Sequence, residues 1–112
     1  MTVEVDGKTI ATNANGYLEN LDDWNEDVAR AMAAAEGIEL TERHWDVINY
    51  LREEYYDNHE NQPNTRTIIK AMSAKWGEKI KQSDLYELFP LDPSKQGGKV
   101  AGLPESRRKG GY

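Results

Sequence analysis

The side chains that most often carry out chemistry in proteins are sparse in this sequence. Its two histidines, His44 and His59, are separated by roughly four helical turns, or over ~20 Å, if that stretch is helical throughout. They therefore cannot share a metal ion within one helix, and we expect each of them to lie at the surface near a helix end. The sequence has no cysteine, which excludes disulfides, thiolate catalysis and sulfur carried on a thiol. Carboxylates are plentiful, but no spacing singles out an acid/base pair, so we expect no catalytic site, metal site or cofactor.

Common motifs for enzymes and secreted or membrane proteins are also missing. The sequence contains no HExxH, no phosphate-binding loop and no Gly-x-Gly-x-x-Gly. It has no run of about 18 apolar residues, which a membrane-spanning helix would need. Its N-terminus also lacks the basic segment and the apolar segment that follow one another in a secretory signal. A cytoplasmic location fits these observations best.

The charge of the chain is divided unevenly. The net charge of −6 combines −11 in residues 1–60 with +5 in residues 61–112. The negative net charge disfavours avid non-specific binding to nucleic acid. A chain with this net charge can still carry a local basic surface. The simplest interpretation is that the two halves fold against each other and partly neutralise.

The elements that must position any site are organised around residues 40–77, which predict two amphipathic helices. Thr41 is a good N-cap for the first helix, and Gly77 follows the second helix where a left-handed residue would end it. Pro63 cannot lie inside a helix, so the turn is expected at Asn58–Asn64. The predicted inward-facing stripes contain Trp45, Val47, Ile48, Leu51, Arg52 and Tyr55 in the first helix and Ile68, Ile69, Met72 and Trp76 in the second.

Shorter elements are predicted on either side of this helical hairpin. Asp6-Gly7 indicates a tight β-hairpin at the N-terminus, and Asn13–Gly16 a second turn. A helix should begin at Asp22 or Asp23, with Asp23 as its cap, and end at Gly37. Ser83 should cap a helix over residues 84–89 that Pro90 ends, and Asp92-Pro93 should begin a last helix that closes at Gly102.

The predicted fold class is α-dominated α+β. We expect an orthogonal bundle of about five helices with the helical hairpin at its core, a short N-terminal β-hairpin and a flexible C-terminal arm. Residues 1–104 should form one domain. Residues 105–112 are basic and Gly-rich with almost no apolar anchors, and are expected to form a mobile tail.

A pair of helices joined by a turn also raises the possibility of a helix-turn-helix. The second helix carries Arg66, Lys70 and Lys75, as a helix that reads a DNA groove would. The turn, however, is longer than that motif uses and lacks its glycine. An ordinary pair of packed helices is therefore the favoured interpretation, and a nucleic-acid interface is the alternative.

Four segments taken in order resemble one protein family. They are GYLENLDDWNEDVA, ELTERHWDVINYLREEYY, LYELFP and KQGGKVAGLP. Together they are similar to the DsrC/TusE family, also called the gamma subunit of dissimilatory sulfite reductase, over residues 3 to about 104. The resemblance implies a small α-rich domain with an N-terminal hairpin and a C-terminal arm, which agrees with the fold expected from the residues.

The resemblance also implies a role in sulfur metabolism. In this family the arm carries a penultimate cysteine that takes up sulfur, and one branch has a second cysteine in a Lys-Gln-Ala-Cys context. The matching positions here are Gly111 and Gly98, so the sulfur-carrying chemistry is missing. The family resemblance places the partner-binding arm at Lys95, Gln96, Lys99, Leu103 and Pro104.

These features lead to two functional hypotheses. The first is a family member without its own catalysis that acts by contact with sulfite reductase or with the sulfur-relay proteins that serve tRNA thiolation. The alternative is a DNA-binding regulator of sulfur genes that uses the helical hairpin.

Overall fold

A two-stranded antiparallel sheet opens the chain, as predicted. In the computed structural model, which describes residues 2–5 and 7–104, β1 (Thr2–Val5) pairs with β2 (Lys8–Ala11), and Val5 lies opposite Lys8. Gly7 has a φ of 80°, as a two-residue type I′ turn requires. The other turn residue, Asp6, lies outside the described residues. A small apolar cluster that contains Val5, Leu18, Val28 and Met32 joins the sheet to the helices beneath it.

The first α-helix begins later than predicted. A 3-10 turn, η1 (Leu21–Asp23), comes first, and α1 spans Glu26–Ala35. Asp23 is therefore not the cap: Asn25 is, and its side-chain oxygen accepts a hydrogen bond from the Val28 amide at 2.9 Å. Trp24 is held in an extended conformation between the two elements because its indole Nε1 donates to the Val100 carbonyl at 2.9 Å.

The helical hairpin is confirmed. It consists of α2 (Glu42–Asp57) and α3 (Thr65–Trp76), with Thr41 at the N-cap of α2 and Gly77 at a φ of 67° after α3. The Asn64 side chain caps α3 by accepting a hydrogen bond from the Thr67 amide at 2.9 Å. The predicted stripes are buried at Val47, Ile48, Leu51, Ile68 and Met72, and half-buried at Trp45, Tyr55, Ile69 and Trp76.

Two short helices complete the bundle. α4 spans Gln82–Leu88, and Ser83 lies inside it rather than capping it. The first turn of α4 is instead closed by Asp84, whose Oδ2 accepts from the Lys81 amide at 2.8 Å. α5 spans Pro93–Val100, and its predicted cap is confirmed because Asp92 Oδ1 accepts from the amides of Ser94 and Lys95 at 3.1 and 3.2 Å.

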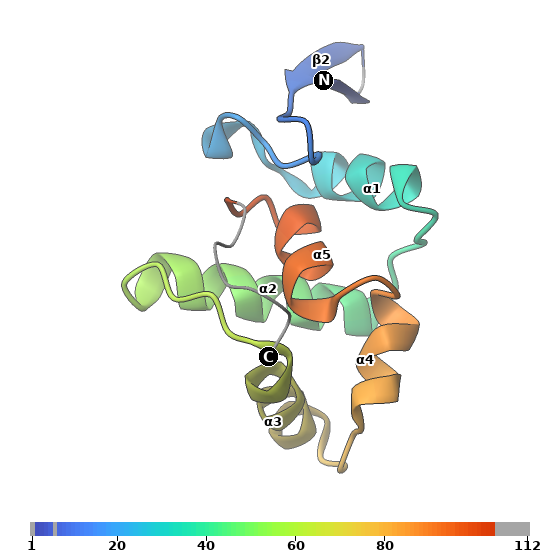
Figure 1. Ribbon diagram of the computed structural model, residues 1–112, viewed down its shortest axis with the longest axis vertical. Coiled ribbons are helices and arrows are strands. Elements are labelled where there is room, and N and C mark those ends of the chain that lie inside the picture. The colour runs from blue at the N-terminus through green and yellow to red at the C-terminus, as the bar shows by residue number, and fades with distance from the viewer. Residues whose placement is uncertain (1, 6, 105–112) are drawn as a thin grey trace.

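Helix α5 lies at the centre of the molecule (Figure 1), between α1 on one side and α2 on the other. The main core surrounds it, with Ile48, Leu51, Ile68, Phe89 and Leu103 among its fully or almost fully buried members. Five α-helices and one β-hairpin over the described residues confirm the predicted fold class. No helix in the described part of the chain is both long and apolar enough to span a membrane.

Candidate partner-docking site

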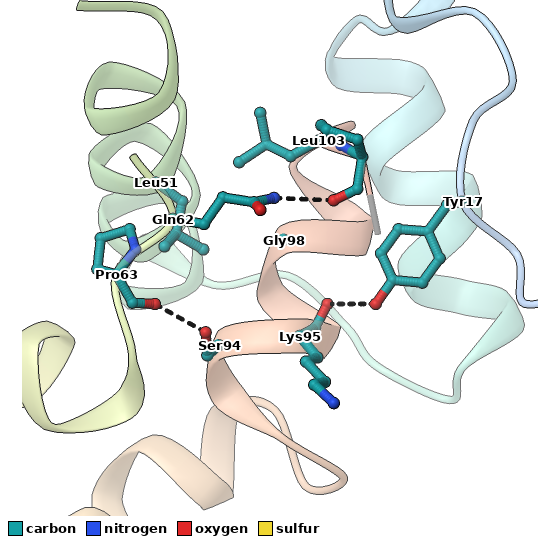
Figure 2. Close-up of a pocket in the computed structure, with 9 residues that line it drawn as sticks. Tyr17, Leu51, Gln62, Pro63, Ser94, Lys95, Gly98 and Leu103 are labelled. Carbon is teal, nitrogen blue, oxygen red and sulfur yellow. Dashed lines mark hydrogen bonds between the residues drawn. The ribbon is translucent and has the colours of Figure 1, made fainter. Parts of the chain in front are cut away.

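The candidate site is a small pocket over the middle of α5, built around Gly98. A Cβ added to the preceding residue, Gly97, would lie 3.1 Å from Leu51 Cδ1 and 3.6 Å from Phe89 Cε2, so Gly97 is packed tightly against α2. A Cβ on Gly98 would meet no atom within 4 Å. Gly98 therefore faces open space, and a side chain at this position would project into the pocket (Figure 2).

Three hydrogen bonds hold the walls of this pocket, and each joins segments that are far apart in the sequence. Gln62 Nε2 donates to the Pro104 carbonyl at 2.8 Å, and Ser94 Oγ donates to the Pro63 carbonyl at 2.7 Å. On the other side, the Tyr17 hydroxyl donates to the Lys95 carbonyl at 3.2 Å (Figure 2). The pocket is partly open, and its volume of about 10 Å³ is near the space that one water molecule needs.

The five residues predicted for the arm divide into two groups. Gln96 and Leu103 are buried, with 4% and 1% of their surface exposed, and Gln96 Oε1 accepts from the Leu91 amide at 3.0 Å. Lys99 is half-buried and its Nζ lies 3.2 Å from Glu36 Oε1. Gln96 and Lys99 both reach Glu36 at the end of α1, Gln96 also bonds the loop before α5, and Leu103 packs in the main core. Lys95 and Pro104 flank the pocket and are partly exposed.

The three cations predicted for a nucleic-acid interface do not form one surface. Arg66 and Lys70 are exposed on α3 and lie one turn apart. Lys75 is rotated away from them, and its Nζ lies 4.0 Å from Asp46 Oδ1 on α2. The helical hairpin therefore presents two adjacent cations rather than a continuous basic face.

His44 is buried, which corrects the prediction that it lies at the surface. Only 5% of its surface is exposed, and its ring packs edge-on against Phe89 at a centroid distance of 5.2 Å. Nδ1 accepts from the Thr41 amide at 3.0 Å, so Nε2 carries the proton and donates to the Leu88 carbonyl at 2.8 Å. The signal was present in the sequence, because His44 lies three and four residues before Val47 and Ile48 on the apolar stripe.

Burial of His44 makes the stability of the fold depend on pH. Desolvation lowers the pKa of His44 below its ordinary value of 6.5, and the hydrogen bond to Leu88 offsets this in part. A proton added at Nδ1 would also face the Thr41 amide, which is another donor. Between the two pKa values the unfolded chain binds more protons than the folded chain, so the free energy of unfolding should fall as pH falls from about 6.5.

Urea unfolding at several pH values between about 5.5 and 7.5 measures this effect in a range where most carboxylates stay ionised. The variant His44→Gln should lose most of the pH dependence in this range, whereas His59→Gln, at an exposed position, should keep it. If the free energy of unfolding depends on pH equally in the original chain and in His44→Gln, His44 is not the source of the pH dependence.

The other histidine and the acidic residues are the possible metal ligands that remain in the described part of the chain. His59 is exposed and has a φ of 53°, followed by Glu60 at 58°. Within residues 2–5 and 7–104, no group of three or more histidine, aspartate or glutamate side chains is close enough to hold a metal ion.

Comparison with known proteins identifies the family. The family model described as "DsrC like protein" matches residues 4–108. This chain belongs to the DsrC-like protein family. The resemblance drawn from the four sequence segments is therefore confirmed.

Members of the DsrC-like family from several organisms are similar to this chain over nearly its whole length. The sulfurtransferase TusE of Yersinia pseudotuberculosis is 45% identical over 104 residues, which are 92% of this chain and 95% of that protein. The NMR structure of Allochromatium vinosum DsrC is 45% identical with a TM-score of 0.85, and 96% of each chain is covered. The oxidized gamma subunit of the dissimilatory sulfite reductase from Archaeoglobus fulgidus is 31% identical with a TM-score of 0.86, covering 96% of this chain and 98% of that one.

These relatives are named as a sulfurtransferase and as a gamma subunit of dissimilatory sulfite reductase, whereas the sequence of this chain contains no cysteine. Gly98, which matches the inner cysteine of the resemblance, lies in the pocket. Gly111, which matches the penultimate cysteine, lies outside the described residues, as does the whole predicted tail of residues 105–112.

Proposed function

We propose that this DsrC-like protein acts in the cytoplasm by contact with sulfite reductase or with sulfur-relay proteins, without carrying sulfur or catalysing a reaction itself. The observation that supports this proposal most is that the Gly98 pocket keeps its walls but has no side chain at Gly98. Its walls are held by the three hydrogen bonds of Gln62, Ser94 and Tyr17, while the position that matches the family cysteine has no side chain. The scaffold is retained without the reactive group.

The part of the surface proposed to meet the partner surrounds this pocket. Pro104 is held by Gln62 at one edge, and Lys95 lies at the other with its side chain extending away from the pocket (Figure 2). Because Gln96, Lys99 and Leu103 are packed into the body, they orient these edges more than they offer contact themselves. A partner that binds here would cover a preformed surface, which reduces the entropy lost on binding.

Affinity purification from the native cells tests the proposed contact. The original chain should recover subunits of sulfite reductase or of a sulfur-relay complex, identified by mass spectrometry. Lys95→Glu should reduce that recovery by about tenfold, which corresponds to the loss of one well-formed charged contact of ~1.4 kcal/mol. The control Lys79→Glu makes the same charge change at an exposed position on the loop between α3 and α4 and should leave recovery unchanged.

Two outcomes would contradict the proposal. One is the absence of sulfite-reductase and sulfur-relay subunits from the recovered material. The other is equal recovery with Lys95→Glu and with the control, which would place the contact elsewhere on the chain.

A further inference from the structure

A shallow groove of about 430 Å³ lies where the C-terminal end of α2 meets η1, away from the Gly98 pocket. Its lining combines three carboxylates and two tyrosine rings with one leucine and one histidine: Leu21, Asp22, Tyr55, Tyr56, Asp57, His59 and Glu60. Tyr56 is one of two large hydrophobic residues in the described part of the chain that are clearly exposed, with 51% of its surface accessible.

The aromatic side of this groove is held in place by specific contacts. The guanidinium of Arg52 stacks on Trp24 at 3.8 Å and on Tyr56 at 4.9 Å, and it donates to the Ala101 carbonyl at 2.7 Å. Tyr55 packs edge-on against Tyr56 at 5.1 Å. The rings are therefore fixed before anything binds, although Tyr56 remains exposed.

The acidic side of the groove is not neutralised by the described residues. None of the ion pairs within residues 2–5 and 7–104 involves Asp22, Asp57 or Glu60. The Glu60 carboxylate accepts a hydrogen bond from the Tyr55 hydroxyl at 3.1 Å, which is a neutral donor.

The helix end adds to this negative potential. The last turn of α2 has no basic residue, and its exposed carbonyl groups carry the negative end of the helix dipole. A lysine or arginine would be favoured here by the carboxylates, by the helix end and by the tyrosine faces.

The chain's own C-terminal tail begins at the edge of the Gly98 pocket and within reach of this groove. The carbonyl of Pro104, the last described residue, is bonded to Gln62, which is two residues after Glu60 and so has its Cα within about 7 Å of Glu60. Arg107, Arg108 and Lys109 follow Pro104 by three to five residues, which gives them a reach of up to about 10–18 Å. Three cations are thus covalently attached within reach of three carboxylates that form no ion pair with any described residue.

We propose that the basic segment Arg107–Lys109 binds intramolecularly in the groove formed by Asp22, Tyr56, Asp57 and Glu60. The attachment at Pro104 supplies an effective concentration in the millimolar range, so weak surface ion pairs suffice to populate the contact. Bound in this way, the tail passes from the edge of the Gly98 pocket to the end of α2. The inference rests on the groove and on the tail sequence, and it holds whether or not the proposed partner contact is correct.

Amide NMR spectra of the full chain test the contact. At about 20 mM salt, Arg107→Gln/Arg108→Gln/Lys109→Gln should shift the amide signals of Tyr56, Asp57 and Glu60 relative to the original chain. At about 500 mM salt, where screening acts over roughly 4 Å, the two spectra should agree at these residues.

A charge exchange distinguishes a direct contact from an indirect one. In Asp22→Lys/Asp57→Lys, the amide signals of Tyr56 and Glu60 should no longer depend on the charges of the tail. Adding Arg107→Glu/Arg108→Glu/Lys109→Glu to that variant should restore the contact, and with it the shift of these signals. The matched control Glu4→Lys/Glu87→Lys makes the same change in net charge at exposed positions on β1 and α4 and should leave the effect intact.

Three results would overturn the proposal. The first is that the amide signals of the groove residues stay unchanged when the tail charges are removed at low salt. The second is a shift confined to another surface, such as α3. The third is a shift that grows with protein concentration, which would mean that the groove binds a second molecule instead of its own tail.

Discussion

Replacing Gly98 with cysteine is expected to turn a chain that accepts no sulfur into one that accepts a single sulfur atom. Incubated with inorganic polysulfide, the original chain should keep its mass, because no side chain in it can form a persulfide. In Gly98→Cys, the thiolate attacks the sulfane sulfur of disulfane, forms a protein persulfide and releases hydrogen sulfide. Space for the new side chain is present, since a Cβ at this position meets no atom within 4 Å.

Intact-mass spectrometry before and after reduction measures this gain. Gly98→Ser is the matched control, because it fills the same space without a thiol and should gain nothing. A stable sulfur adduct on the original chain would show that it has another acceptor. The absence of an adduct on a folded Gly98→Cys would show that the pocket is closed to the donor.

Two glycines near the end of α5 are expected to respond to alanine in opposite ways. Gly102 has a φ of 74°, and a Cβ there would overlap the Trp24 ring and approach Trp24 Cβ to 2.8 Å. Trp24 cannot easily move, because its indole is bonded to the Val100 carbonyl and its ring stacks on Arg52. Strain and overpacking together should cost Gly102→Ala ~3 kcal/mol of unfolding free energy or more.

Gly98→Ala serves as the comparison. It lies inside α5 in helical backbone with open space at its Cβ, so it should gain ~0.5–1 kcal/mol from helix propensity. Urea unfolding of both variants measures the difference. Similar free energies of unfolding for the two variants would contradict the packing described around Trp24.

Local chemistry in the sequence was enough to predict most of the fold. The β-hairpin, the Thr41 and Asp92 caps, the Pro63 turn and the Gly77 end each depend on residues close together in the chain. Such signals hold when no distant contact overrides them. The sequence predicted a helix start or a residue's burial wrongly where a distant contact or a competing cap determined it.

The start of α1 and the position of His44 show why the rest was harder to predict. The sequence around Asp23 and Glu26 favours a cap there, but the bond from Trp24 to Val100, 76 residues away, keeps the chain extended until Asn25. His44 lies on the apolar stripe, but the Leu88 carbonyl that accepts from its Nε2 and so satisfies it in the core is 44 residues away. Neither partner can be inferred from sequence spacing alone.

The candidate site was predicted in part. The family resemblance located Gly98, but the open space at its Cβ and the tight packing of Gly97 depend on how α5 crosses α2. The burial of Gln96 likewise depends on other segments, because its side chain is bonded to Leu91 and to Glu36. The groove at the end of α2 was not predicted, because its residues come from η1, α2 and the following loop.

The central claim is that this chain works by contact and carries no sulfur, and one measurement tests both parts. The tagged full chain is purified from its native cells under non-reducing conditions, and the intact mass of the chain and the identity of its bound subunits are determined from the same sample. We predict that sulfite-reductase or sulfur-relay subunits are bound to a chain that carries no added sulfur. A chain that carries covalent sulfur, or one that binds none of these subunits, would contradict the claim.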